Sequence, residues 1–177
     1  MKVIAIIGNG KDKFTSEQAV FAKMLIRELL TQPSEEKITL TSGHSIMGGI
    51  DIWAEEIAKE VGAYDESFIF IPQTEQWNDM CIAPTPTQKL PKNHKCWDKC
   101  YANYHWLDGY QSRNQKIAEA ANIVYVIVSA QYPSNYLDKK YSLCYHCKKT
   151  DHVKSGACWT AKYAEKLGKR AIWHIIG

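Results

Sequence analysis

The chain has 177 residues, a length that suits one domain with a hydrophobic core of its own. Hydrophobic residues make up 45% of it and charged residues 23%, which is ordinary for a globular protein and excludes a low-complexity chain. The net charge of +3 is small and spread along the sequence. Composition therefore favours neither a nucleic acid nor an anionic membrane as the partner, and excludes neither.

Short apolar runs alternate along the chain with stretches of helical periodicity. The predicted strands are residues 3–7, 37–41, 67–72, 123–128 and 171–176. The predicted helices begin at Thr15 or Ser16, Ile50, Gln115 and Cys158. The expected buried face of the first helix comprises Val20, Phe21, Met24, Leu25 and Leu29. The alternation predicts a single α/β domain over residues 1–177, a Rossmann-like parallel sheet flanked by helices.

The apolar run at residues 3–7 is too short for the core of a signal peptide, and no cleavage site follows it. No stretch of the sequence is long and apolar enough to span a membrane. We therefore expect a cytoplasmic protein without a membrane partner, in a reducing compartment. Six cysteines in that setting indicate metal-binding, reactive or buried thiols more than disulfides.

Two insertions, at about residues 73–108 and 130–154, interrupt the alternation. The first contains three of the six prolines, and its part from 96 to 108 is a candidate helix rich in aromatic side chains. These aromatic side chains could stack on a base, although packing over the sheet edge or a partner subunit is the favoured interpretation. Trp77, which follows a predicted strand, and Tyr110, which comes just before Arg113, are the most plausible aromatic neighbours of a ligand.

The second insertion carries potential metal ligands. Cys144, Cys147, His152 and Cys158 follow the spacing C-x2-C-x4-H-x5-C, whose last gap is one residue longer than in a zinc knuckle. These ligand types are those of a structural zinc site, and four protein ligands leave no open position for a water. The sequence therefore predicts a zinc-binding insertion that braces the segment before Ser155.

Two other interpretations of the cysteines stay open. Cys158 begins a helix beside a glycine, where a thiolate would be stabilised, so it could be a reactive thiol. Cys96 and Cys100 could instead join Cys144 and Cys147 in an all-cysteine site, which would leave His152 out. His146 lies between two expected ligands and is predicted to be exposed.

Residues 39–53 predict a strand, a glycine-rich loop and the start of a helix, an arrangement that suits a phosphate. Asp51 and Ser45 are candidates to cap that helix. His44 in the loop either contacts a ligand or is solvated. Because ligands bind beyond the carboxyl ends of parallel strands, we expect the loops at these ends to form one cleft. The residues expected there are Gly8, Asn9, Ser42, Gly43, His44, Gly48, Gly49, Ser129, Ser155 and Gly156.

Four short motifs occur in a fixed order: Ser42-Gly43, Gly48-Gly49-Ile50-Asp51, Arg113-Asn114 and Ser155-Gly156. With them the chain resembles the SLOG superfamily of Rossmann-like proteins, and within it the YspA-like branch. The superfamily includes the Smf/DprA DNA-processing proteins and the LOG phosphoribohydrolases. The first motif is loose, because Ser42-Gly43 stands for a Gly-Gly pair and the loop is longer than the family loop.

The resemblance implies a nucleotide or nucleotide-derived ligand, with Asp51 and Arg113 in its site and the guanidinium on phosphate. Asn114 would cap the next helix or fix a loop carbonyl. In LOG enzymes a glutamate of the last loop assists glycosidic cleavage; if Thr160 matches the family threonine, Tyr163 takes the place of that glutamate. The resemblance also implies a homo-oligomer.

These observations favour a binding role, as a sensor, carrier or sequestering protein. One alternative is a nucleotide-processing hydrolase of the N-glycosidase or phosphoribohydrolase type, with Asp51, Glu55 or Cys158 in an unusual role. Another is single-stranded nucleic-acid binding, for which the modest positive charge gives little support. Whether the chain is an enzyme stays open at this point.

Overall fold

The computed structural model describes residues 1–45, 47–72, 104–107, 110–137 and 143–177. Cys81, Cys96 and Cys100 lie outside these residues, as do Trp77 and most of the first insertion. None of the helices in the described ranges combines the length and apolar character needed to cross a bilayer.

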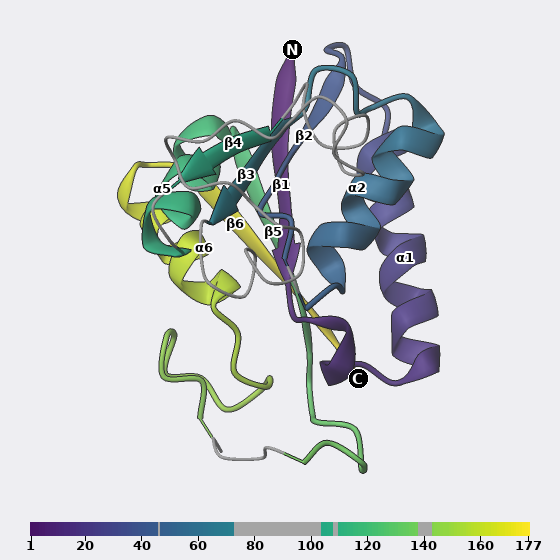
Figure 1. The fold of residues 1–177 in the computed structure, drawn as a ribbon, viewed down its shortest axis with the longest axis vertical. Coiled ribbons are helices and arrows are strands. Elements are labelled where there is room, and N and C mark those ends of the chain that lie inside the picture. The colour runs from purple at the N-terminus through teal and green to yellow at the C-terminus, as the bar shows by residue number, and fades with distance from the viewer. Residues whose placement is uncertain (46, 73–103, 108–109, 138–142) are drawn as a thin grey trace, which may run out of the picture.

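The described strands form one parallel sheet in the order β4-β3-β2-β1-β5-β6 (Figure 1). Their bounds are β1 Lys2–Gly8, β2 Ile38–Ser42, β3 Phe68–Pro72, β4 Tyr104–Leu107, β5 Ile123–Ser129 and β6 Arg170–Ile176. In the register, Ile4 of β1 pairs with Leu40 of β2 on one side and with Ile123 of β5 on the other. The predicted Rossmann-like α/β fold is confirmed.

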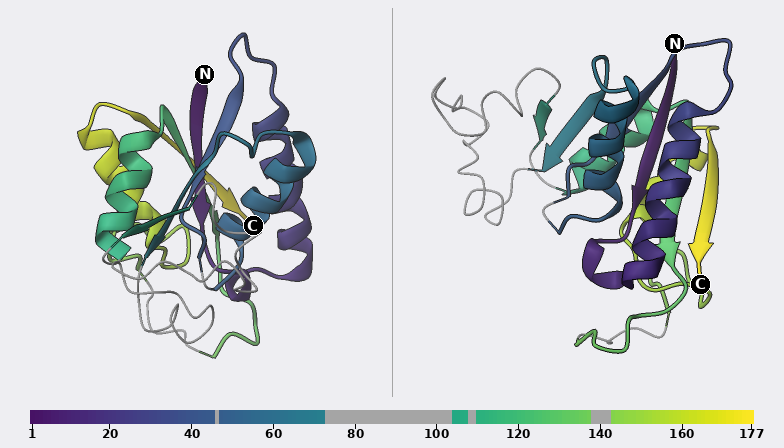
Figure 2. Two further views of the ribbon diagram at one scale, coloured as in Figure 1. Left: turned by 45° about the horizontal axis from the view of Figure 1, so that its top comes forward. Right: turned by 90° about the vertical axis from the view of Figure 1, so that its right-hand side faces the viewer.

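Helices cover both faces of the sheet (Figure 2). On one face lie α1, Ser16–Thr31, and α2, Ile50–Val61; on the other lie α5, Tyr110–Ala120, and α6, Ala157–Lys166. Side chains of β1 alternate between the two layers, because successive residues of a strand point to opposite faces. Ile4 and Ile6 pack with α1 and α2, whereas Ala5 and Ile7 pack with α5 and α6.

The first helix begins with a capping box at its N-terminus. The Thr15 hydroxyl accepts a hydrogen bond from the backbone N–H of Gln18, and the Gln18 side chain accepts one from the backbone N–H of Thr15. The predicted buried face is wrong for Val20, Phe21 and Met24, which are exposed. Leu29 is buried as predicted and Leu25 is partly buried against the core. The other apolar residues that the helix buries are Ala22, Ile26 and Leu30.

Two predicted elements differ from the structure near the first insertion. Residues 104–107, expected in a helix, form β4, which extends the sheet by pairing with β3 from Ile69↔Tyr104 to Pro72↔Leu107. Helix α5 begins at Tyr110 and not at Gln115. Arg113 and Asn114 therefore lie inside the helix, and Asn114 does not cap it.

Candidate functional site

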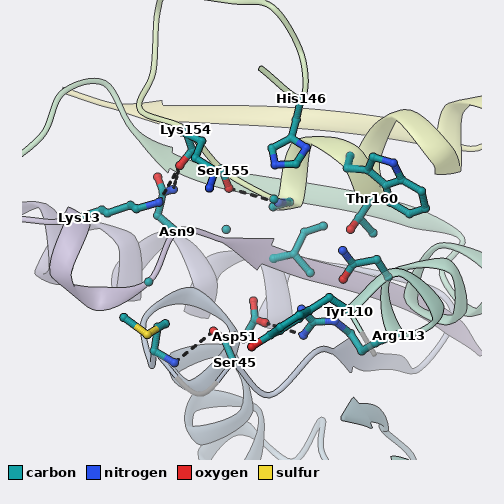
Figure 3. A pocket seen from close by; sticks show the side chains of 18 of the residues that line it. Asn9, Lys13, Ser45, Asp51, Tyr110, Arg113, His146, Lys154, Ser155 and Thr160 are labelled. Atoms are coloured by element: carbon teal, nitrogen blue, oxygen red, sulfur yellow. Dashed lines mark hydrogen bonds and ion pairs between the residues drawn. The ribbon is translucent and has the colours of Figure 1, made fainter. Parts of the chain in front are cut away.

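A cavity of about 640 Å³ opens at the carboxyl edge of the sheet, where β1 and β5 end side by side. The strand order reverses between these two strands, which is where ligands bind in open parallel sheets. The walls come from the loop after β1, the starts of α2, α5 and α6, and the segment between β5 and α6 (Figure 3).

The predicted ligand residues divide into two groups. Those that line the cavity are Gly8, Asn9, Asp51, Arg113, Asn114, Ser155 and Gly156. Those absent from the described lining are Ser42, Gly43, His44, Gly48, Gly49 and Ser129. Several members of the second group hold members of the first group in place.

Asn9 joins three segments beneath the cavity. Its side-chain oxygen accepts a hydrogen bond from the backbone N–H of Ser129 at 3.0 Å, and its amide nitrogen donates to the carbonyl of Lys154 at 3.1 Å. Its backbone N–H donates to Ile127 of β5 at 3.2 Å. Asn9 is thus a positioning residue that ties the end of β1 to β5 and to the segment before α6.

Gly49 is the N-cap of α2, with φ of 83° and no side-chain capping bond. A Cβ at this position would overlap the backbone of Asn9, Gly10 and Lys11, and the backbone N–H of Ile50 donates to the Asn9 carbonyl at 3.2 Å. The prediction that Asp51 or Ser45 caps the helix is wrong, because the close approach of these two loops requires a glycine. Asp51 instead lies buried in the first turn, where the helix N-terminus favours a carboxylate.

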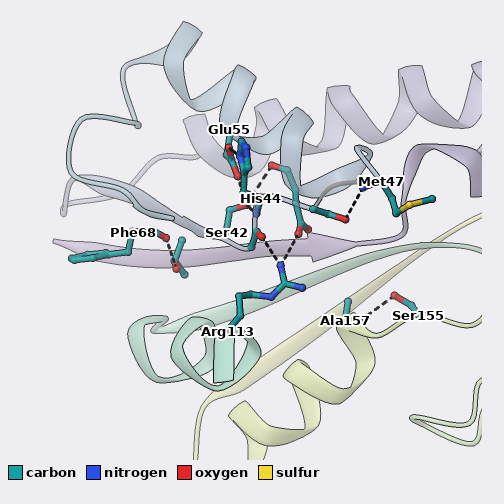
Figure 4. Close-up of polar contacts among 12 residues, drawn as sticks. Ser42, His44, Met47, Glu55, Phe68, Arg113, Ser155 and Ala157 are labelled. Atoms are coloured by element: carbon teal, nitrogen blue, oxygen red, sulfur yellow. Dashed lines mark hydrogen bonds and ion pairs between the residues drawn. The ribbon is translucent and has the colours of Figure 1, made fainter. Parts of the chain in front are cut away.

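Arg113 is only 8% exposed and reaches from α5 toward α2 (Figure 4). Its Nη1 donates to the Gly43 carbonyl at 2.5 Å and lies 3.6 Å from Asp51 Oδ2. A Cβ at Gly43 would overlap the guanidinium. The buried Nε of Arg113 has no hydrogen-bond partner within the described part of the chain. Arg113 therefore holds the loop after β2 while it lines the cavity.

Burial raises the pKa of Asp51 to about 6. The Arg113 guanidinium opposes this rise, the Glu55 carboxylate adds to it, and His44 and the backbone N–H of Gly8 oppose it more weakly. A carboxyl group that ionises near neutral pH thus faces the cavity.

We expect Asp51 to make stability depend on pH. Its pKa is about 6 in the folded chain against an ordinary 3.8, so its contribution is fully present below the lower value and is lost as pH rises through the upper one. The loss amounts to about 3 kcal/mol. Measured by urea unfolding, the free energy of unfolding of wild type should decline between pH 4 and pH 7.5. In Asp51→Asn this decline should be smaller by about 3 kcal/mol.

The matched control for this measurement is Asp65→Asn, because Asp65 is exposed and lies after α2. Its unfolding free energy should follow that of wild type at every pH. Parallel curves for Asp51→Asn and wild type would contradict the raised pKa.

A second carboxylate, Glu55, is buried behind Asp51. It accepts a hydrogen bond from the Ser42 hydroxyl at 2.8 Å and lies 2.5 Å from His44 Nδ1. His44 adopts a positive φ of 46° in making this contact. Ser42 and His44, which we expected to contact a ligand, thus contact the buried carboxylate of Glu55. The loop after β2 therefore has a structural role.

Sequence analysis missed the basic residues of the cavity. Lys13 lies after β1, and its ammonium donates to the Lys154 carbonyl at 2.8 Å. The Lys154 ammonium lies 4.9 Å from the centre of the Tyr145 ring. His146 is half-buried and not exposed as predicted; burial and then Lys154, Lys13 and Lys148 lower its pKa. One side of the cavity is therefore electropositive.

The N-terminus of α6 adds to this positive side. Ser155, Gly156, Ala157 and Thr160 all line the cavity, and the Ser155 hydroxyl accepts a hydrogen bond from the backbone N–H of Ala157 at 3.3 Å. The partial positive charge of a helix N-terminus favours an anion here. Tyr163 stacks on Trp159 with ring centroids 5.4 Å apart. The carboxylates among the described lining residues are Asp12 and Asp51.

The four predicted metal ligands come together as one buried group. Their ligand atoms all lie within 4.8 Å of one another, and His152 Nε2 lies 3.4 Å from Cys147 Sγ and 3.3 Å from Cys158 Sγ. Tetrahedral zinc with sulfur at its usual distance places ligand atoms about 3.7 Å apart, which is close to this arrangement. The Cys3His group could hold a metal ion.

The surroundings of this group fit a metal as well. Asp151 Oδ1 lies 2.7 Å from His152 Nδ1, an arrangement that directs Nε2 to the cluster. Burial raises the pKa of the Cys144 thiol, but the backbone N–H groups of Ser155, Cys147 and His146 outweigh it and lower the pKa to about 6. Burial raises the pKa of Cys158, which argues against an activated nucleophile at this position.

No family model matches the chain, and no curated protein matches it. Among solved structures it is similar to the molybdenum cofactor carrier protein MCP from Chlamydomonas reinhardtii, with a TM-score of 0.55 and 16% sequence identity. The match covers 97% of this chain and 75% of that chain. At this level of identity the similarity establishes the fold, so the chain shares its Rossmann-type α/β architecture with a cofactor carrier protein.

Proposed function

We propose that the chain binds a nucleotide or nucleotide-derived small molecule that carries phosphate, and that it acts as a carrier, sensor or sequestering protein. The observation that carries the proposal is the electropositive side of the cavity, which Lys13 and Lys154 line together with the N-terminus of α6. Ammonium groups and helix N-termini are common phosphate ligands.

The rest of the cavity suits the organic part of such a ligand. Tyr110, Tyr136, Tyr145 and Trp159 are among its lining residues and offer aromatic faces to a base. The Tyr110 ring lies 5.5 Å from the Arg113 guanidinium carbon, which places a cation behind one of these faces. We propose that a base lies on this aromatic side and the phosphate on the lysine side.

The order of short motifs typical of the SLOG superfamily supports a nucleotide-like ligand. The similar structure belongs to a cofactor carrier, which supports holding a ligand over transforming it. We further propose that zinc occupies the Cys3His group, because three thiolates and one imidazole are a usual set for structural zinc.

A second candidate function is hydrolysis of an N-glycosidic or phosphate bond. The observation in its favour is Asp51, a cavity-lining carboxyl whose pKa of about 6 suits acid or base catalysis near neutral pH. Tyr163 at the position of the LOG glutamate argues against the LOG route, because a phenol does not supply a carboxylate to an oxocarbenium-like centre.

Incubation with nucleotides, dinucleotides and cyclic nucleotides, followed by chromatography and mass spectrometry, separates the two functions. A compound retained intact and released on denaturation supports the binding role. A free base or sugar phosphate that accumulates over several turnovers would establish the hydrolase instead.

Lys13→Gln and Lys154→Gln are expected to weaken binding of the retained nucleotide by about tenfold each, because each removes a charge-assisted contact to phosphate. The matched control is Lys166→Gln, which makes the same charge change in the last turn of α6, away from the cavity. Isothermal titration calorimetry gives the three affinities. Equal losses in all three variants would show that only net charge matters and would contradict a phosphate site at these lysines.

A further inference from the structure

Metal ligands and cavity walls come from the same short segment, residues 144–158. Cys144, Cys147, His152 and Cys158 form the buried Cys3His group. The residues between them that line the cavity are Tyr145, His146, Lys154, Ser155, Gly156 and Ala157. A shift of the four metal ligands would therefore also shift the cavity-lining residues between them, which include Lys154 and the start of α6.

Hydrogen bonds connect the cluster to the cavity directly. Cys144 Sγ accepts from the backbone N–H of Ser155 at 3.5 Å, and Ser155 lines the cavity. The preceding carbonyl, that of Lys154, accepts from Asn9 at 3.1 Å and from Lys13 at 2.8 Å. The segment is thus bonded to the cluster through Ser155, and to Asn9 and Lys13 after β1 through the carbonyl of Lys154.

The cluster is also a buried support of this segment, beside the bond from the backbone N–H of Val153 to the Ser129 carbonyl. Cys144, Cys147 and Cys158 form an apolar cluster of their own, separate from the two cores that flank the sheet. Without a metal, thiols and an imidazole hold one another only weakly, and a site of this kind gains its order when the metal binds.

We propose that metal binding and ligand binding are coupled: the Cys3His metal fixes Lys154, His146 and the start of α6 in the positions that bind phosphate. This inference rests on the proposed function, and it adds that the affinity for ligand is set by metal occupancy. Because coupling between two sites is reciprocal, a bound phosphate ligand raises the affinity for the metal by the same factor.

The test uses ADP as the probe and the full chain in zinc-loaded, chelator-treated and zinc-reloaded forms, with circular dichroism to verify the fold. We expect ADP affinity to fall by about tenfold or more without metal and to return on reloading. Saturating ADP should raise the affinity for zinc, measured at equilibrium by competition with a chromogenic chelator, by the same factor. Equal ADP affinity in all three forms would overturn the coupling and leave the binding function standing. Absence of ADP binding to the zinc-loaded chain would count against the binding function itself, and the coupling with it.

Asp151→Asn extends the test to a chain that keeps its metal ligands. The Asp151 side chain is 52% exposed, supports His152 and is not part of the described cavity lining. Loss of such a partner weakens metal binding by about 10–100-fold. The free zinc concentration that gives half of the maximal ADP binding should rise with it, while Asp65→Asn should leave it unchanged. An unchanged midpoint in a variant with measurably weaker zinc binding would overturn the coupling.

Discussion

Cys144→Ser is expected to abolish stoichiometric metal binding and to lower the thermal stability of the chain. Cys144 is fully buried, and its sulfur accepts the backbone N–H of Ser155 in addition to facing the other three ligands. Structural zinc contributes about 10–16 kcal/mol of apparent binding free energy in small zinc domains, and much of this is folding free energy. Elemental analysis of the purified variant and its melting temperature give the result directly.

Two cysteine variants complete this experiment. Cys81→Ser is the matched control and should keep both metal and stability. The double variant Cys96→Ser, Cys100→Ser tests the all-cysteine alternative, and we expect it to keep its metal, because His152 already completes a set of four ligands. Full metal content in Cys144→Ser would remove that residue from the set, and loss of metal in the double variant would favour the all-cysteine site.

Arg113→Met is expected to destabilise the chain by about 3–5 kcal/mol, the usual cost of leaving a buried charge without its partner. The substitution leaves the Asp51 carboxylate unpaired and the Gly43 carbonyl without its donor. Combining it with Asp51→Asn should restore part of the stability, because no buried carboxylate then remains at that position. Urea unfolding of the two single variants and the double variant measures the interaction as a double-mutant cycle.

The control for Arg113 is Arg27→Met, which breaks an exposed ion pair with Glu60. Exposed pairs are worth at most about 1 kcal/mol, so this variant should remain close to wild type. An Arg113→Met variant as stable as Arg27→Met would show that the buried arginine does not hold the loop after β2. If Arg113→Met is unstable, a loss of ligand binding in an Arg113 variant is explained by the loosened structure and not only by a lost contact to the ligand.

The fold could be predicted from the sequence because its main elements have strong local patterns. The runs that became β1, β2, β3, β5 and β6 are apolar and bounded by glycine, proline or polar residues. β4 is a short edge strand without such a pattern. Its pairing with β3 identifies it as a strand. In α1, Val20 and Met24 have the same helical spacing as the buried Ala22 and Ile26, so periodicity alone does not identify the face that packs on the sheet.

In the site, too, residues marked by a local sequence pattern could be predicted, and residues brought together from distant segments could not. The proposed metal ligands lie within one short segment, so their spacing is visible in the sequence. Lys13 and Lys154 meet across 141 positions, and neither lies in a motif that marks it. The N-cap of α2 was missed for a related reason: the requirement for Gly49 comes from the approach of Asn9, which propensities for capping residues do not include.

The central place of β1 in the sheet has a consequence for how the protein is made. β2 pairs with β1 early in synthesis, but β5 follows only after residue 122, and the contact between Asn9 and Lys154 spans 145 positions. Domains complete such distant contacts late, after the local ones. A nascent chain that ends before Cys144 already contains β1, α1 and α2, yet it lacks both the segment that would hold a metal and one wall of the cavity. The capacity to bind metal and ligand therefore requires residues 144–158 to have been synthesised and packed against the end of β1.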